Sequence, residues 1–542
     1  MPEDLPEGYY LDNFKYLLDF VVEKHGHLLS EPEYRYRDQF ASASENAKKL
    51  YVRLTNRKGP HFRQDKINYP EINNLSAVVS ELIGLSLVDS STPTLEHAIA
   101  LCDKKELSQL EAFAAWPKSC RRSEMVEQLI ATGTCNPIEE LDLPVIEVLG
   151  LEKLLVYRLL FFGNFHQDMT EFVLHELVSP FEAYNLSDES SAFSSRSIVD
   201  LTIELKLLSE RAHEVIDTDE TGDEIAALIE EMPFRPDDAM TARRFDRLLN
   251  RVARQLERLD RKEGALYVYK LTSATPSRER QARILEKLGR LMDALDLCEQ
   301  IYDAPLDEEE WEFSLSFGQR LARKHQLETS LPRNDKVPPP QETIRISRVV
   351  ERVELCAVQH YTDAGETCFY VENMLFRGIF GLAFWDIIFA PVPGAFFHPF
   401  QRGPSDLYTS DFVASRSGLI DRRCADLLDS DQLRQRVLYC YEGRYGVANQ
   451  FVNWQYLSRE LLELALAQIP AEHLCKVFDR LLIDLKNNAS GLPDLIIFGE
   501  SGYRLVEIKG PGDTIQKNQE RWFRYFNTHG IPATLVNVEW AN

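Results

Sequence analysis

Two short apolar runs near the C-terminus constrain the fold of this chain most, because charged residues stand at fixed positions within and beside them. The runs cover residues 495–498 and 503–508, and a short turn with a glycine at each end joins them. Runs of this length, rich in β-branched and aromatic residues around such a turn, predict a β-hairpin. If the turn is symmetric, Phe498 pairs with Tyr503, and counting outward places Asp494 opposite Glu507.

Three charged side chains of this hairpin are therefore expected to meet. Directly opposed residues in antiparallel strands have Cβ atoms about 4.5–5.5 Å apart, and the alternation of a strand puts Lys509 on the same face as Glu507. Adjacent carboxylates repel each other, so the pattern predicts a bound divalent cation, and oxygen ligands suit Mg2+ or Mn2+. The alternative is an ordinary surface hairpin whose charges are solvated.

The order of these residues, Pro-Asp followed after a gap by Glu-x-Lys, resembles the PD-(D/E)xK nuclease superfamily. The longer string through Gly510, Pro511, Asp513, Gln519 and Trp522 resembles its VRR-NUC subfamily. The resemblance implies an α/β nuclease domain of the restriction-endonuclease type. We expect this domain over residues 340–542, after a proline-rich linker at residues 331–341.

The composition fits a soluble protein of several domains. A length of 542 residues predicts three or four of them, and no apolar run approaches the roughly 18 residues of a membrane-spanning helix. Nine cysteines without zinc-binding spacing favour a reducing compartment. We therefore expect no membrane association and a place in the cytoplasm or the bacterial nucleoid.

The net charge of −25 argues against binding a polyanion over the whole surface, so a nucleic-acid site must be a local basic track. One candidate follows an amphipathic helical pattern in an N-terminal helical region, residues 1–75. Basic residues there surround a Gly-Pro turn beside Phe62, which suits phosphate binding, although a charged surface loop explains them almost as well. The candidate DNA contacts are Arg53, Arg57, Lys58 and Arg63.

Residues 106–129 read as two short amphipathic helices around a bend at Pro117. The arrangement resembles a SAP motif, a small DNA-binding module, and we expect this module over residues 76–147. Its usual glycine near the bend is replaced here by Ser119-Cys120, and a simple helical hairpin is the alternative. The candidate phosphate contacts are Lys118, Arg121 and Arg122.

Residues 148–335 read as almost continuously helical, with one internal repeat. Residues 256–276 align without a gap on residues 285–305, and small alanines with a terminating proline resemble tetratricopeptide (TPR) repeats. One helix here, residues 242–262, carries an arginine stripe opposite its apolar face. The stripe is either neutralised by neighbouring carboxylates or available to a polyanion, and its candidate DNA contacts are Arg247, Arg251 and Arg254.

A nuclease core of this type needs a further carboxylate ahead of its hairpin, and Glu372 stands at the start of an apolar helical stretch. The strings WDIIF (residues 385–389), DLYTSDF (406–412) and YEGRYGVANQFVNW (441–454) resemble the Fanconi-anaemia-associated nuclease family. The order SAP, TPR, VRR-NUC matches that family, and the lack of a ubiquitin-binding zinc finger resembles its bacterial type. The expected fold is multidomain and mostly α, with a C-terminal α/β nuclease domain.

The resemblance implies a metal-dependent, structure-specific DNA nuclease that cuts near 5′ flaps and digests 5′ to 3′ in interstrand crosslink repair. Branched DNA is the implied partner. One departure is Asn518, where the eukaryotic nuclease has a lysine that contributes to 5′-phosphate capture, so dependence on a 5′ phosphate stays open. A four-way (Holliday) junction resolvase and a catalytically inactive DNA-binding scaffold are the alternatives.

The expected roles of the site residues follow from this chemistry. Metal ligands would be the carboxylates of Glu372, Asp494 and Glu507 and the carbonyl of Ile508. Lys509 would orient the nucleophile or stabilise the charge of the phosphorane. Gln519 would support the site from the following helix.

Overall fold

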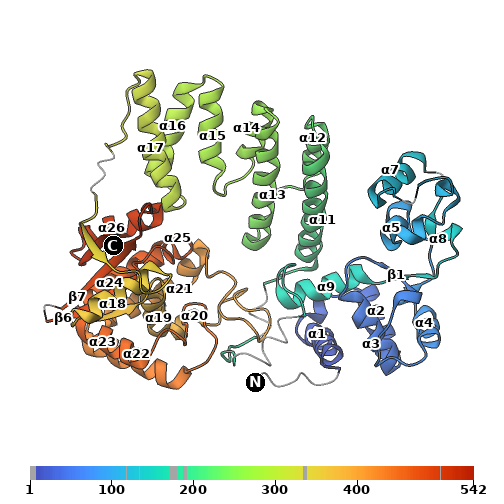
Figure 1. Ribbon diagram of the computed structural model, residues 1–542, viewed down its shortest axis with the longest axis horizontal. Helices are drawn as coiled ribbons and strands as arrows, with labels where there is room; N and C mark the ends of the chain where they lie inside the picture. Colours follow the sequence, from blue (N-terminus) through green and yellow to red (C-terminus); the bar gives the residue numbers. More distant parts are fainter. Residues whose placement is uncertain are drawn as a thin grey trace. The chain divides into compact units, whose positions relative to one another are not determined.

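The computed structural model describes residues 8–117, 119–133, 135–169, 180–186, 192–333, 338–500 and 502–541. The chain divides into two compact units, Met1–Val178 and Ser179–Asn542 (Figure 1). Both are mainly helical, as expected, and the second also contains the mixed sheet that carries the candidate site. Within the described residues, no helix is long and apolar enough to cross a membrane.

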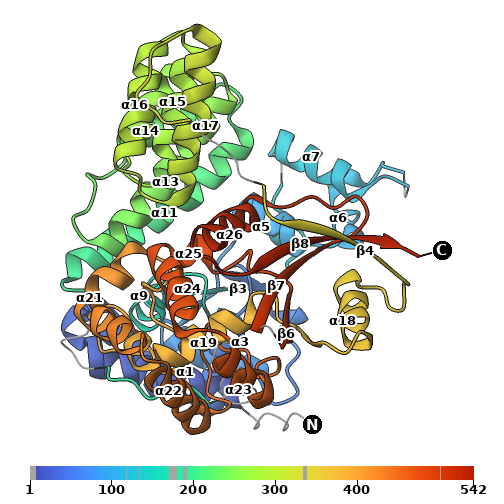
Figure 2. The same ribbon diagram turned by 90° about the vertical axis from the view of Figure 1, so that its left-hand side faces the viewer.

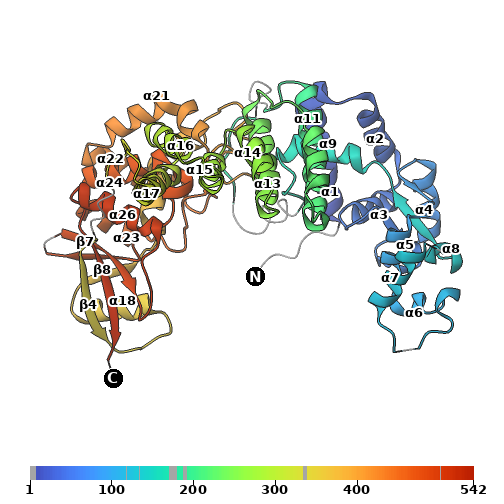
Figure 3. The ribbon, with the colours of Figure 1, turned by 90° about the horizontal axis from the view of Figure 1, so that it is seen from above.

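The first unit is a helical bundle joined to a small antiparallel sheet (Figure 3). Aromatic side chains of Phe14, Tyr51 and Tyr157 are fully buried between its larger helices. Its strands are β1 (His61–Arg63), β2 (Val88–Asp89) and β3 (Val145–Val148), in the order β1-β3-β2. Its helices are α1 (Tyr9–His25), η1 (Gly26–Leu28), α2 (Glu31–Ser42), α3 (Glu45–Thr55), η2 (Gln64–Lys66), α4 (Leu75–Gly84), α5 (Leu95–Leu101), α6 (Lys104–Leu107), η3 (Glu111–Phe113), α7 (Arg122–Thr132), α8 (Pro137–Glu140) and α9 (Leu151–Phe162).

This small sheet joins the two modules expected on either side of residue 75. Strand β3 lies near the end of the SAP-like segment and pairs with β1 from the N-terminal segment, with Phe62 opposite Ile146. A separate small core under α5 and α7 includes Ile99, Leu107 and Met125. The two segments therefore share one sheet, while the SAP-like segment keeps its own core.

The second unit begins with an arm of paired helices (Figures 1 and 3). The arm contains α11 (Arg196–Thr218), α12 (Asp223–Glu230), α13 (Ala239–Arg258), α14 (Lys262–Lys270), α15 (Ser277–Lys287), α16 (Leu291–Asp303) and α17 (Glu308–His325). The backbone follows the sequence repeat. Asp260 and Gly289, which the repeat aligns, both adopt left-handed φ values of 59° and 73°. The next residue bonds back at 2.9 Å in each case, Arg261 to Leu256 and Arg290 to Leu285.

The nuclease region is a five-stranded mixed sheet covered by helices on both faces (Figure 2). The strand order is β4-β8-β7-β6-β5, and β8 runs parallel to both β4 and β7 while the other pairs are antiparallel. The strands are β4 (Gln341–Ile346), β5 (Thr367–Tyr370), β6 (Leu495–Gly499), β7 (Gly502–Lys509) and β8 (Ala533–Trp540). The helices are α18 (Val353–Asp363), α19 (Met374–Ala383), α20 (Trp385–Ile388), α21 (Ser410–Asp426), α22 (Ser430–Arg444), α23 (Arg459–Gln468), α24 (Ala471–Ile483), α25 (Leu485–Asn488) and α26 (Lys517–Thr528).

Helices on both faces explain why the runs around the turn are continuously apolar. Leu495 and Ile497 pack in one core with residues of α18, while Ile496 and Phe498 pack in the larger core under α19, α24 and α26. A strand buried on both faces carries apolar side chains at every position. The sheet therefore holds the ends of β6 and β7 rigidly, and the charged residues stand at those ends.

Candidate active site

The hairpin has the register expected from its sequence. Phe498 pairs with Tyr503, and the ladder continues to Leu495 opposite Val506. Asp494 immediately precedes β6, and its Oδ2 accepts a hydrogen bond of 2.9 Å from the N–H of Ile508. Asp494 is therefore tied to the strand segment that carries Glu507 and Lys509.

Glu507, Lys509 and Gln519 form a closed hydrogen-bonded group. The ammonium of Lys509 lies 2.9 Å from Glu507 Oε1 and donates to Gln519 Oε1 at the same distance. Gln519 donates from Nε2 to Glu507 Oε1 at 2.5 Å. The side chains of Glu507 and Lys509 are only 2% and 10% exposed. Gln519 lies in the first turn of α26, so this helix fixes the orientation of both strand residues.

Burial and mutual repulsion make the two hairpin carboxyls hard to ionise. Burial, followed by the charge of Asp494, raises the pKa of Glu507 to about 8 even though Lys509 opposes the rise. Burial also raises the pKa of Asp494 to about 6, against the hydrogen bond from Ile508. Two acids whose pKa values are raised in this way are characteristic of a site whose full charge is offset by a ligand.

Glu372 lies at the same edge of the sheet, between β5 and α19. The N–H groups of Val371 and Glu372 both donate to the carbonyl of Asp494, at 2.7 and 2.9 Å. Glu372 adopts φ of 35°, a left-handed conformation that a glutamate rarely takes. Its carboxylate accepts hydrogen bonds from the hydroxyl of Tyr370 and, at 3.3 Å, from Asn373.

The residues present fit a hard divalent cation. Glu507 Oε2 is buried and has no hydrogen-bond partner among the described residues, so one carboxylate oxygen of the site is left without a donor. The donor set is carboxylate oxygen, as Mg2+ and Mn2+ require. As placed here, the described His, Cys, Asp and Glu side chains form no group of three that could hold a metal ion. A metal ion held by Glu372 together with Asp494 and Glu507 would therefore draw the three carboxylates closer to one another.

Three residues beside the site were missed in the sequence. Arg352 donates from Nη2 to the Tyr370 hydroxyl at 2.8 Å, and its Nε lies 3.4 Å from Glu354. The charge of Glu354 contributes to raising the pKa of Asp494. No motif marked these residues. The sequence did offer one clue to Glu354, which lies in the first turn of α18, the helix that packs on the hairpin strands.

The N-terminal basic residues separate into paired and exposed ones. Arg53 donates to Glu71 at 2.9 and 3.1 Å. Arg63 was wrongly assigned to the DNA surface, because its side chain is 2% exposed and is bound by Asp65 and Glu106. Arg57 and Lys58 are exposed.

The SAP-like candidates also differ. Lys118 lies outside the described residues. Arg122 donates from Nη2 to the carbonyls of Ile99 and Cys102, at 2.8 and 3.0 Å, and so ties α7 to α5. Arg121 is exposed at the start of α7. Of the three candidates, Arg121 is therefore the one whose exposed side chain is not used to hold α7 against α5.

The arginine stripe of α13 is neutralised only in part. Arg254 pairs with Glu257 at 3.0 Å. Arg247 and Arg251 donate only to main-chain carbonyls, those of Arg243 and Ser209, in the contacts of the described residues. Burial and then the charges of Arg243 and Arg251 lower the pKa of Arg247. Neutralisation by a carboxylate therefore holds for part of the stripe, and DNA contact by Arg247 and Arg251 stays a prediction.

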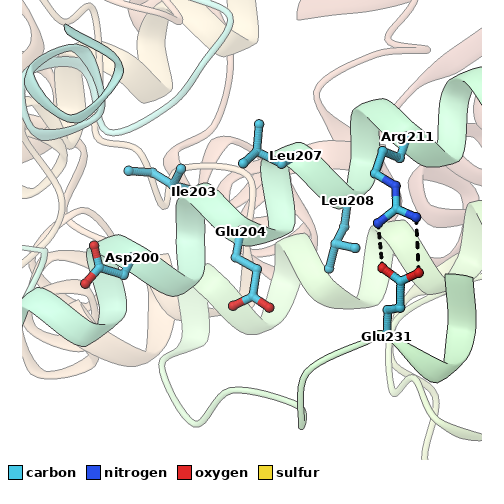
Figure 4. A pocket seen from close by; sticks show the side chains of 7 residues that line it. All are labelled: Asp200, Ile203, Glu204, Leu207, Leu208, Arg211 and Glu231. Atoms are coloured by element: carbon cyan, nitrogen blue, oxygen red, sulfur yellow. Dashed lines mark hydrogen bonds and ion pairs between the residues drawn. The ribbon is translucent and has the colours of Figure 1, made fainter. Parts of the chain in front are cut away.

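A surface groove on the arm is a separate feature (Figure 4). Its apolar side chains come from α11, and an ion pair of 2.5 Å between Arg211 and Glu231 closes one end. None of the candidate catalytic residues lines it. The lining residues are Asp200, Ile203, Glu204, Leu207, Leu208, Arg211 and Glu231.

Two family models match the chain. The model for the FAN1 HTH domain matches residues 8–89, which include the N-terminal helices and strands β1 and β2. The model for the VRR-NUC domain matches residues 428–540. The second match contains Asp494, Glu507, Lys509 and Gln519, while Glu372 lies upstream of it.

Similar proteins extend the likeness over the whole chain. A Fanconi-associated nuclease 1 homolog of Pseudomonas aeruginosa is 34% identical over 99% of this chain and 97% of its own length. The homolog of Arabidopsis thaliana is 24% identical over 98% of this chain and 67% of its own length. A crystal structure of paFAN1 bound to 5′ flap DNA with a gap covers 99% of this chain and 100% of that one, with 32% identity and a TM-score of 0.87. The chain belongs to the Fanconi-associated nuclease family.

Proposed function

We propose that this chain cuts DNA at 5′ flaps, with Asp494 and Glu507 as the central ligands of a catalytic metal ion. The chain is a DNA nuclease, and VRR-NUC nucleases depend on divalent metal ions. The solved structures of paFAN1 hold 5′ flap DNA, which supports the same substrate class here. The observation that carries the metal assignment is the neighbouring carboxylates of Asp494 and Glu507, because the buried Glu507 Oε2 lacks a donor among the described residues.

Four residues of the site would bind the catalytic metal ion. A Mg2+ or Mn2+ ion at this position would polarise the scissile phosphate and lower the pKa of an attacking water. Asp494 and Glu507 would bind it in their ionised forms, with the carbonyl of Ile508 and the carboxylate of Glu372 as further oxygen ligands. These assignments rest on the common sheet edge that the four residues share.

Lys509 would act on the phosphate rather than on the metal. An ammonium has three N–H donors, and two of those of Lys509 are directed at Glu507 and Gln519. The third is available to a phosphate oxygen or to the nucleophile, where a fixed positive charge stabilises the transition state. Gln519 holds both neighbours by hydrogen bonds and has a positioning role.

The DNA arms would lie on local basic surfaces. Support is strongest for exposed or unneutralised residues, namely Arg57, Lys58, Arg121, Arg247 and Arg251. Digestion from 5′ to 3′, a role in interstrand crosslink repair and a location in the cytoplasm or nucleoid belong to the same proposal. A four-way junction resolvase is not favoured, since both paFAN1 complexes contain 5′ flaps.

Cleavage of labelled 5′-flap, 3′-flap, nicked and four-way-junction DNA in Mg2+ and in Mn2+ tests this proposal. The expected result is cutting of the 5′ flap in preference to the other substrates. Lys509→Ala and Asp494→Ala should abolish cutting while flap binding persists. Preferential cutting of the junction, or cutting by either variant at the wild-type rate, would overturn the assignment.

A further inference from the structure

A tyrosine and an arginine outside the proposed ligand set hold the carboxylate of Glu372. The hydroxyl of Tyr370 donates to Glu372 Oε2. Arg352 donates from Nη2 to that same hydroxyl at 2.8 Å, and its guanidinium carbon lies 4.7 Å from the centre of the tyrosine ring. The three side chains form one directed chain of hydrogen bonds, from guanidinium to phenol to carboxylate.

The direction of this chain strengthens its last bond. A hydroxyl that accepts a hydrogen bond from a cation becomes polarised and donates more strongly. Arg352 therefore supports the bond from Tyr370 to Glu372 by acting on the tyrosine hydroxyl. Stacking of the guanidinium on the tyrosine ring also fixes the orientation of both groups.

Rigid elements carry both supporting residues. Tyr370 is the last residue of β5 and pairs with Leu495, the residue after Asp494. Arg352 immediately precedes the first residue of α18, which packs on the hairpin strands. The hydrogen-bond chain is thus anchored at the same sheet edge as Asp494 and does not depend on a long loop.

We propose that Tyr370 and Arg352 are positioning residues that hold the Glu372 carboxylate at the sheet edge of Asp494, from which it closes on a metal ion bound by Asp494 and Glu507. This inference rests on the proposed role of Glu372 as a metal ligand. Among the described residues the three carboxylates do not form a metal-binding group, so binding must draw Glu372 toward the other two. A carboxylate already held in one orientation at the same sheet edge has less conformational freedom to lose when it does so. Groups that orient a metal ligand typically change metal affinity by about 10–100-fold when they are removed.

Mn2+ binding by the full chain, measured by isothermal titration calorimetry without DNA, tests the inference independently of catalysis. Tyr370→Phe keeps the ring and removes the hydroxyl, and we expect it to weaken Mn2+ binding by at least about tenfold. Arg352→Gln should weaken it in the same direction by less. Raising the Mn2+ concentration should restore cleavage by Tyr370→Phe, because only metal occupancy is impaired.

Tyr361→Phe is the matched control. Tyr361 is a buried tyrosine of α18 whose hydroxyl contacts Glu342 at 3.4 Å instead of a site carboxylate. It should bind Mn2+ as the wild type does. Thermal unfolding in a chelator should show Tyr370→Phe and Tyr361→Phe to be similarly stable, which separates positioning from a purely structural role.

Glu372→Gln separates the proposed role of Glu372 as a metal ligand from the proposed positioning role of Tyr370. It should weaken Mn2+ binding, and adding Tyr370→Phe to it should cause no further loss, because the two changes act on one interaction. If Glu372→Gln weakens binding while Tyr370→Phe binds like wild type, the positioning role is overturned and the metal site stands. If Glu372→Gln binds like wild type, Glu372 is no ligand, and both assignments fail.

Discussion

At the scale of single residues, the raised pKa values of Asp494 and Glu507 make stability depend on pH. In unfolded chains such carboxyls titrate near about 4, whereas the folded values are about 6 and about 8. The metal-free folded state therefore retains protons that the unfolded chain releases. The stabilisation is fully present below pH 4 and is lost as pH rises through 8.

The same protons compete with a metal ion. Mn2+ binding requires both carboxyls to be ionised, so affinity should increase from pH 6 to pH 8 with release of protons. Calorimetry in two buffers of different ionisation enthalpy measures that release. The variant Asp494→Asn with Glu507→Gln removes both groups and should show neither the pH-dependent binding nor the loss of metal-free stability. Metal affinity that is constant over this range would contradict the assignment.

Sequence reasoning reached the hairpin residues because their relation is local. Strand alternation and a symmetric turn suffice to bring Asp494, Glu507 and Lys509 together. Glu372 required family resemblance, since no local rule relates it to the hairpin. The burial of Arg63 could not be foreseen, because one of its partners, Glu106, is 43 residues away and approaches only through the tertiary fold.

At the scale of elements, carboxylates at the start of α17 tie the arm to the nuclease helices. Glu312 accepts hydrogen bonds from Arg521 at 2.9 Å and from Arg524 at 3.0 Å, both on α26. Glu308 accepts from Arg480 of α24 at 2.9 and 3.0 Å. These contacts use part of the acidic excess of the chain. They also fix α26, which carries Gln519.

Glu312→Gln should therefore lower the free energy of unfolding. Breaking a fully buried ion pair costs about 3–5 kcal/mol, and the cost here should be smaller, because Glu312 is 24% exposed although Arg521 is only 6% exposed. Urea unfolding measures the change. Glu539→Gln is the control, since its pair with Arg345 is exposed on both sides and should contribute less than about 1 kcal/mol. Equal effects of the two changes would argue against a linking role for α17.

The repeat makes a second prediction for the arm. Gly289 follows the C-terminus of α15 in a left-handed conformation, and an added Cβ would meet no atom within 4 Å. Gly289→Ala should destabilise the protein by about 1–2 kcal/mol through backbone strain alone. Gly418→Ala is the contrasting control, since it lies inside α21 with open space around it and should stabilise by about 0.5–1 kcal/mol. Thermal unfolding shifts of the same sign would contradict this reading of the turn.

At the scale of the whole molecule, periodicity and family resemblance predicted a mostly helical chain with a C-terminal α/β nuclease domain, and the fold has this composition. The association of segments was less predictable. Strands β1, β2 and β3 are only two to four residues long and lie far apart in the chain, so their pairing leaves almost no sequence pattern. The sequence therefore predicted two separate modules, whereas in the first unit one sheet joins the N-terminal and SAP-like segments.

Net charge gives the last prediction. With a net charge of −25, the protein as a whole repels DNA, and binding must depend on a few arginines that no carboxylate neutralises. Arg247 and Arg251 fit this requirement, since among the described residues they donate hydrogen bonds only to main-chain carbonyls. Replacing both by alanine should weaken 5′-flap binding. It should also reduce the slope of log affinity against log salt by about 2, one unit for each lost phosphate contact.

Fluorescence anisotropy with flap DNA in Ca2+, over a series of salt concentrations, measures this slope without cleavage. Arg290→Ala is the matched control, because it removes the same charge from the arm but from an arginine already paired with Asp293 at 2.7 Å. It should leave the slope nearly unchanged, since a neutralised arginine releases few counterions from DNA. A wild-type slope in the Arg247→Ala, Arg251→Ala variant would place the DNA elsewhere and assign the stripe to structure. A reduced slope with unchanged Mn2+ binding would separate DNA capture on the arm from chemistry at the hairpin.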